Sequence, residues 1–194
     1  MADISPLRRF VAGMTDLADQ SHGDEQAMVG VTKYLLTDLI SSDDWLPAEY
    51  AVEGDTYRQY LLHCDPHQRF SVVSFVWGPG QTTPIHDHTV WGLIGMLRGA
   101  ETGQRFDVGG DGSLIPGATD LLEHGDVDVV SPTLGDIHKV SNAHEDRTSI
   151  SIHVYGANIG AVDRHVYDPD TGAQKSFISG YSNAAVPNLW DLSG

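Results

Sequence analysis

The chain of 194 residues is poor in cysteine, in basic side chains and in long apolar runs. Its single cysteine, Cys64, cannot form an internal disulfide, and we expect a buried or half-buried strand residue without a catalytic role. Lys and Arg number 11 against 27 acidic residues, and the formal charge of −16 argues against nucleic acid and anionic membranes as partners. No stretch has the apolar length of a transmembrane helix, and the start lacks the features of a signal peptide, so we expect a cytoplasmic protein.

The length is that of one domain, 1–194, with two parts of different pattern. Residues 1–50 read as helical. We expect one helix with Ser5 as its cap and Pro6 as its first residue, and a second helix over about 25–40, with Met28, Val31, Leu35 and Leu39 directed inward. Residues 57–181 alternate short runs of Val, Ile, Phe and Tyr with Gly- and Pro-containing turns, a pattern typical of a jelly-roll β-barrel.

Three histidines have the spacing of a metal site. His86 and His88 are two residues apart, so in an extended segment they point to the same face, and His138 can reach the same ion from a facing strand. Neutral imidazole binds iron, copper, nickel and zinc, and ligand identity alone does not separate these metals. The remaining histidines, apart from His153, lack this spacing, and we expect surface or edge positions for them: His22, His63, His67, His124, His144 and His165.

These segments resemble the two halves of the cupin signature. The first half reads Gly80, five residues, His86 and His88, then Gly92 at the position where a cupin has a metal-binding Glu. The second half reads Gly125, Pro132, Gly135, His138 and Asn142, with one extra residue in each of its first two gaps. The resemblance implies a cupin barrel whose metal is held by neutral ligands only. Such an ion keeps its full charge, which favours anionic substrates.

A second polar pattern lies in the segment from Ser149 to Tyr155. Ile150, Ile152 and Val154 alternate with Ser151, His153 and Tyr155, which predicts a strand with one apolar and one polar face. On composition alone the polar face would meet solvent. Inside a barrel that holds a metal, the three side chains can instead pass hydrogen bonds along the strand, with His153 fixing the tyrosine hydroxyl.

With this strand added, the chain resembles the cysteine dioxygenase type I family of cupin thiol dioxygenases, over about residues 57–181. The resemblance implies Fe(II) on His86, His88 and His138, and a catalytic relay of Ser151, His153 and Tyr155. It implies a small thiol and O2 as partners, and a sulfinate as product.

The substrate-binding positions resemble the bacterial branch that prefers 3-mercaptopropionate. Gln59 aligns with the arginine that binds the cysteine carboxylate in animal-type members, and Gly92 replaces the cysteine that cross-links to the tyrosine there. The resemblance assigns the substrate carboxylate to Arg164, whose planar guanidinium suits that task. The alternative for Arg164 is a surface ion pair with Asp163 or Asp168.

Three other functions stay open at the level of sequence. One is a cysteine dioxygenase proper. The second is a zinc or nickel cupin acting as an isomerase or hydrolase, and the third is a non-catalytic cupin that binds a small acid.

Overall fold

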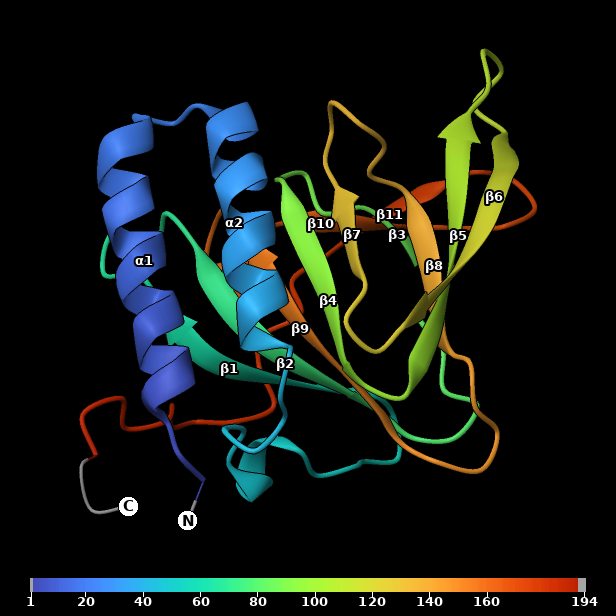
Figure 1. Ribbon diagram of the computed structural model, residues 1–194. Coiled ribbons are helices and arrows are strands. Elements are labelled where there is room, and N and C mark those ends of the chain that lie inside the picture. The colour runs from blue at the N-terminus through green and yellow to red at the C-terminus, as the bar shows by residue number, and fades with distance from the viewer. Residues whose placement is uncertain (1, 192–194) are drawn as a thin grey trace.

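The computed structural model describes residues 2–191, which form a two-sheet β-barrel with two helices packed on one side (Figure 1). The helices are α1 (Ser5–Ser21) and α2 (Glu25–Leu39), and a short 3₁₀ turn, η1 (Ala48–Tyr50), precedes the first strand. The mainly β class with N-terminal helices is therefore confirmed. No helix of the described part has the length and apolar character needed to cross a bilayer.

The two sheets are antiparallel and face each other. The first has the order β1-β2-β9-β4-β7 and consists of β1 (Arg58–Cys64), β2 (Ser71–Trp77), β9 (Ser149–Tyr155), β4 (Gly92–Arg98) and β7 (Val127–Val130). The second has the order β11-β10-β3-β8-β5-β6, and its strands are β11 (Gln174–Phe177), β10 (Arg164–Tyr167), β3 (Ile85–His86), β8 (His138–Asn142), β5 (Ala100–Val108) and β6 (Leu114–Glu123). A 3₁₀ turn, η2 (Ile159–Ala161), connects β9 to β10.

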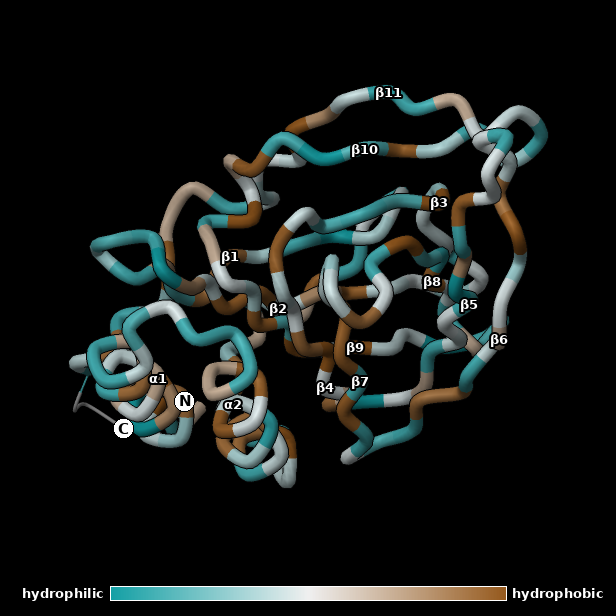
Figure 2. Tube along the Cα trace, turned by 90° about the horizontal axis from the view of Figure 1, so that it is seen from above, coloured by the Kyte–Doolittle hydropathy of each residue, from teal (hydrophilic) through white to brown (hydrophobic). Residues whose placement is uncertain are grey.

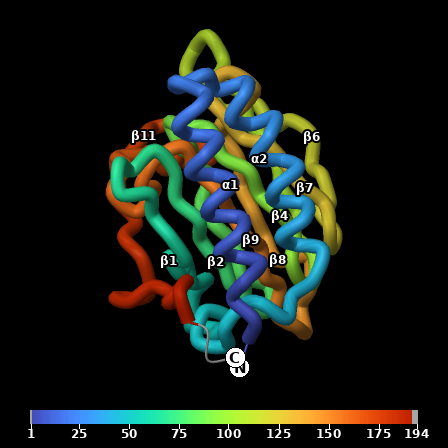
Figure 3. Tube along the Cα trace, turned by 60° about the vertical axis from the view of Figure 1, so that its left-hand side comes forward, coloured from blue at the N-terminus to red at the C-terminus, as the bar shows by residue number. Residues whose placement is uncertain are grey.

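The first sheet is covered on both faces, which explains its apolar sequence. Both α1 and α2 lie across its outer face (Figure 3), on the side away from β10 and β11 (Figure 2). Every residue of β2 and of β9 is consequently buried. Outward-facing Ile150, Ile152 and Val154 join the helix core, whereas Tyr155 belongs to a separate cluster inside the barrel. Each large apolar side chain buried in this way contributes about 1.5–3 kcal/mol.

The helices differ from expectation in two details. The cap of α1 is Ile4, without a side-chain hydrogen bond, and Pro6 lies in the first turn. In α2 the buried stripe is Met28, Thr32, Leu36 and Leu39, whereas Val31 is 43% exposed. The predicted stripe was wrong at Val31 because the polar Thr32, whose hydroxyl contacts the sulfur of Met14, takes the inward position.

Cys64 is half-buried at the end of β1, as expected. Its thiol lies 3.6 Å from the carbonyl oxygen of Asp65, and burial raises its pKa. A raised pKa keeps the thiol protonated and unreactive at neutral pH.

Candidate metal centre and substrate cavity

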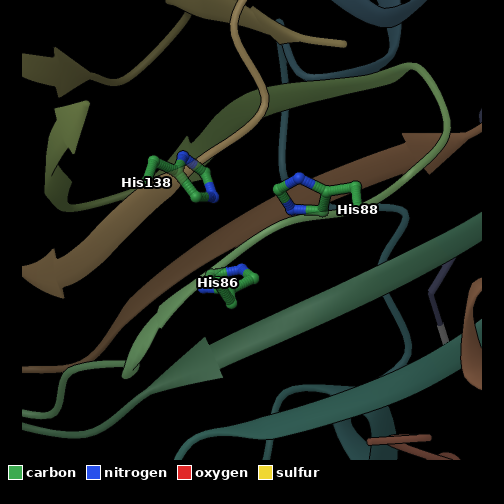
Figure 4. Close-up of side chains that lie close together, drawn as sticks. All are labelled: His86, His88 and His138. Atoms are coloured by element: carbon green, nitrogen blue, oxygen red, sulfur yellow. The ribbon is translucent and has the colours of Figure 1, made fainter. Parts of the chain in front are cut away.

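The three predicted histidines converge at one point inside the barrel (Figure 4). His86 in β3 pairs directly with His138 at the start of β8, and His88 follows β3. Ring centroids are 4.8 Å apart for His86 and His138, 5.0 Å for His86 and His88, and 4.9 Å for His88 and His138. One possible ligand nitrogen from each ring lies within 4.8 Å of the other two.

These rings are prepared to act as neutral ligands. Burial is the main cause that lowers the pKa of His86 to about 3, and repulsion from the neighbouring His88 adds to it. Burial also lowers the pKa of His138 well below its ordinary value. His86 Nδ1 lies 3.0 Å from the carbonyl oxygen of Pro84, and His88 Nδ1 lies 2.9 Å from Asp136 Oδ1. When each Nδ1 donates to its oxygen, each Nε2 keeps its lone pair for a metal.

Two aspartates that sequence reasoning missed hold the histidine segment in place. Asp136 accepts from the backbone N–H of His88 and of Thr89 as well as from the His88 ring. Burial is the largest single effect on Asp136 and would raise its pKa, but the hydrogen bonds from the His88 ring and from the backbone N–H groups of His88 and Thr89, together with the attraction to His88, outweigh it and the pKa is lowered. The feature of the sequence that could have identified Asp136 is its position two residues before the ligand His138.

The second missed aspartate is Asp87, between the two ligands. It accepts from the backbone N–H of His165 at 2.7 Å, from His165 Nδ1 at 2.9 Å and from the Tyr167 hydroxyl at 2.8 Å. His165 thus ties β10 to the metal-binding segment, which corrects the expectation of an ordinary edge histidine. The position of His165 in the sequence could not have shown this contact, because β10 and β3 are far apart in the chain and are brought together only by strand pairing.

No acidic residue among residues 2–191 joins the histidine group, and the packing around Gly92 shows why. Gly92 pairs with Tyr155 across β4 and β9. A β-carbon on Gly92 would lie 2.7 Å from the Tyr155 ring, closer than carbon atoms approach one another. The ring of Tyr155 therefore occupies the space that the cupin carboxylate would need.

Ser151, His153 and Tyr155 form a continuous hydrogen-bond chain along the inner face of β9. Ser151 Oγ lies 2.8 Å from His153 Nε2, and His153 Nδ1 lies 2.8 Å from the Tyr155 hydroxyl oxygen. Trp77 donates its indole N–H to Ser151 Oγ at 3.1 Å. Desolvation lowers the pKa of His153 well below its ordinary value and raises the pKa of Tyr155, so both are neutral at pH 7.

One cavity of about 230 Å³ brings the predicted residues together. It is lined by the three histidines and by His153, Tyr155, Gln59 and Arg164, while Ser151 lies behind His153. Aromatic side chains that sequence reasoning did not assign, Tyr57, Phe75 and Trp77, form part of the wall. The volume suits a molecule of a few non-hydrogen atoms.

Arg164 is directed into this cavity from the start of β10 and is only 4% exposed. Its guanidinium donates to Ser179 Oγ at 2.7 Å and lies 4.7 Å from the centre of the Phe177 ring. Arg164 makes no ion pair with any described residue, so the surface pair considered above is not formed. Its Nε is buried without a hydrogen-bond partner.

Gln59 reaches the same cavity from β1, and its amide nitrogen donates to the carbonyl oxygen of Gly180. Arg58, the preceding residue, is exposed on the opposite side of the strand. The amide of Gln59 therefore contributes a neutral polar group, and it fixes the segment after β11 against the cavity.

Comparison with known proteins finds a relative among curated sequences and similar folds among solved structures. The chain is 27% identical to cysteine dioxygenase type 1 of Bos taurus over 155 residues, covering 76% of each chain. A double-stranded β-helix protein of Klebsiella pneumoniae superposes with a TM-score of 0.47 at 19% identity, covering 58% of this chain and 89% of its own. A Cupin 2 conserved barrel domain protein of Salinispora arenicola gives a TM-score of 0.43 at 21% identity, covering 58% and 86%. No family model matches the chain.

Proposed function

We propose that this protein is an Fe(II)-dependent thiol dioxygenase that converts a small carboxylated thiol into a sulfinate. The observation that carries the proposal is a cavity of about 230 Å³ lined by the three histidines, by Tyr155 of the relay and by Arg164, whose Nε has no hydrogen-bond partner. The similarity to a cysteine dioxygenase supports the same reaction class.

The donor set fits a divalent metal. Three neutral imidazoles converge, two of them are oriented by oxygen acceptors on Nδ1, and no described carboxylate competes for the ion. Iron(II) bound there would supply the Lewis acidity that favours the thiolate and the redox chemistry that activates dioxygen. The overall reaction balances without another reductant, because RSH and O2 together give RSO2H, and sulfur loses the four electrons that O2 accepts.

The chain's own residues supply binding and proton placement. The buried Nε–H of Arg164 is an unsatisfied donor on a side chain that lines the cavity, and a substrate carboxylate would provide the acceptor it lacks. The Tyr155 hydroxyl, held by His153, is a pre-organised hydrogen-bond donor in the same cavity. Aromatic side chains form part of the wall, and such apolar surroundings strengthen both interactions.

Arg164 and Gln59 favour 3-mercaptopropionate over cysteine as the substrate. Both thiols offer Arg164 a carboxylate, but cysteine must also place an ammonium group near a cationic metal. The neutral amide of Gln59 already donates to the carbonyl oxygen of Gly180, and none of the described residues that line the cavity is acidic, so none can stabilise that ammonium. We therefore expect the specificity constant to be higher for 3-mercaptopropionate.

Oxygen uptake tests the proposal directly. The full-length protein is loaded anaerobically with Fe(II), and oxygen consumption is followed after addition of 3-mercaptopropionate, cysteine or cysteamine. We expect one O2 consumed per sulfinate formed, fastest with 3-mercaptopropionate. Absence of uptake with all three thiols at full iron occupancy would refute the proposal and favour a non-catalytic or non-iron cupin.

His86→Ala tests the ligand set. We expect loss of iron retention, because two histidines leave the ion with too few protein ligands, and activity should fall with iron content. The control is His67→Ala, which removes an exposed histidine outside the cavity. Normal iron content in His86→Ala would remove this residue from the site.

A further inference from the structure

A buried carboxyl group lies behind the relay, away from the cavity. Glu101 is the second residue of β5, in register with Leu122 of β6 and Asn142 of β8, and it is only 2% exposed. Its Oε1 has no hydrogen-bond partner. An ionised carboxylate in such a place is strongly disfavoured, and burial accordingly raises the pKa of Glu101 to about 8.

Glu101 is connected to the relay through Ser151 and Trp77. The polar groups of these two side chains lie near enough to the Glu101 carboxyl to lower its pKa, which partly offsets the larger effect of burial. Ser151 is also the residue that contacts His153 Nε2. The polar chain therefore has four members in order: Glu101, Ser151, His153 and Tyr155.

The hydrogen bonds from Glu101 to Tyr155 can be donated in either of two directions, as a count of the available protons shows. Ser151 Oγ carries one proton, which it sends either to His153 or to Glu101, whereas Trp77 can only donate and in this structure donates to Ser151 Oγ. If Ser151 donates to His153 Nε2, the imidazole carries its proton on Nδ1 and donates to Tyr155, whose hydroxyl proton is free for the cavity. If Ser151 donates to Glu101, His153 carries its proton on Nε2 and Tyr155 must donate to Nδ1.

The charge of the carboxyl selects between these directions. An ionised Glu101 only accepts, so it draws the Ser151 proton and turns the Tyr155 proton away from the cavity. A protonated Glu101 can donate to Ser151 instead, which leaves the Ser151 proton for His153. We propose that Glu101 is a positioning residue that, in its protonated form, makes Tyr155 a hydrogen-bond donor toward the cavity.

This direction matters for an anionic substrate, and to that extent the inference rests on the proposed function. With its proton turned toward His153, Tyr155 presents only lone pairs to the cavity, and these repel a thiolate. With its proton turned outward, Tyr155 donates to it. The side chains known to face Glu101 are Leu122, Asn142, Trp77 and Ser151, none of them acidic or basic, and the ionisable groups linked to it are His153 and Tyr155.

The tautomer of His153 is the direct readout, and it does not depend on activity. Full-length protein with ¹⁵N-labelled histidine is loaded with diamagnetic Zn(II), and long-range ¹H–¹⁵N correlation spectra are recorded from about pH 6 to about pH 9.5, on either side of the Glu101 pKa. The His153 signals are assigned by their loss in His153→Gln. We expect the proton on Nδ1 at low pH and on Nε2 at high pH.

Two variants test whether Glu101 is the cause of this switch. Glu101→Met removes every acceptor at the buried end, so His153 should keep its proton on Nδ1 at all pH values. Glu101→Gln has a side chain of the same shape as Glu and serves as the second variant if Glu101→Met does not fold. It should also abolish the pH dependence of the His153 tautomer. Glu123→Gln, an exposed acid on neighbouring β6, is the control and should switch like wild type. A wild-type tautomer that is constant over the range, or a switch that persists in both variants, overturns the proposal.

Kinetics separate this inference from the proposed function. In the iron-loaded enzyme we expect kcat to fall about tenfold per pH unit above the Glu101 pKa, and this fall to be absent in Glu101→Gln, with KM nearly unchanged because Arg164 is not involved. If no thiol is oxidised, the proposed function fails while the tautomer result still decides the role of Glu101. If the thiol is oxidised but wild type and Glu101→Gln share one pH profile, the role of Glu101 fails and the function stands.

Discussion

Replacing Glu101 by Gln should change how the stability of the protein depends on pH. The pKa of Glu101 rises from 4.5 to about 8 on folding, because the carboxyl is buried. Between these values the folded protein keeps a proton that the unfolded chain has lost, so the free energy of unfolding falls as pH rises. The rise of about 3.5 units corresponds to a loss of about 5 kcal/mol by pH 8, at 1.36 kcal/mol per unit.

Because Gln does not ionise, the free energy of unfolding of the variant does not fall in this way as pH rises. The free energy of unfolding of Glu101→Gln minus that of wild type should be constant below pH 4.5. It should rise by about 1.4 kcal/mol per pH unit up to about pH 8 and then level off. Contributions from the metal-binding histidines cancel in this difference, because both proteins contain them.

Urea unfolding followed by circular dichroism, at pH values from about 5 to about 9, measures this difference. A total effect of about 5 kcal/mol would be a large part of the 5–15 kcal/mol typical of a domain, and it exceeds the error of the method. Glu123→Gln is the matched control and should show no such rise. A difference for Glu101→Gln that changes by less than about 1 kcal/mol over the range would show that Glu101 ionises as an exposed acid does.

Three further substitutions test the cavity. Tyr155→Phe should lower kcat about 10²-fold at unchanged iron content, as expected for loss of a pre-organised donor; an unchanged kcat would exclude that role. Arg164→Ala should raise KM about 10²-fold for 3-mercaptopropionate and much less for cysteamine, whereas exposed Arg58→Ala should change neither. Equal effects on both thiols would show that Arg164 does not bind the carboxylate. Asp136→Asn should weaken metal binding 10–100-fold in chelator competition, because it loosens the His88 ring, and unaltered affinity would contradict this.

Local periodicity was enough to predict the fold class, the three candidate metal ligands and the relay strand, whereas Gln59 and Arg164 were nominated by the resemblance to thiol dioxygenases. The two-residue spacing of His86 and His88 puts both rings on one face, and the alternation from Ser149 to Tyr155 separates an apolar from a polar face. Both patterns depend only on backbone geometry within one segment. The same reasoning wrongly placed Val31 on the buried face of its helix. Which face is buried depends on the partner against which the helix packs, and here Thr32 packs inward with its hydroxyl on the sulfur of Met14.

The sequence by itself therefore determined which side chains share a face, and with that the barrel and the candidate ligands. Only the tertiary structure decided which residues support them. Asp136 reaches His88 across 48 positions, His165 reaches Asp87 across 78, and Glu101 meets Ser151 from the opposite sheet. The physical reason is that strand pairing and sheet packing bring together residues far apart in the chain, and no local pattern records these contacts.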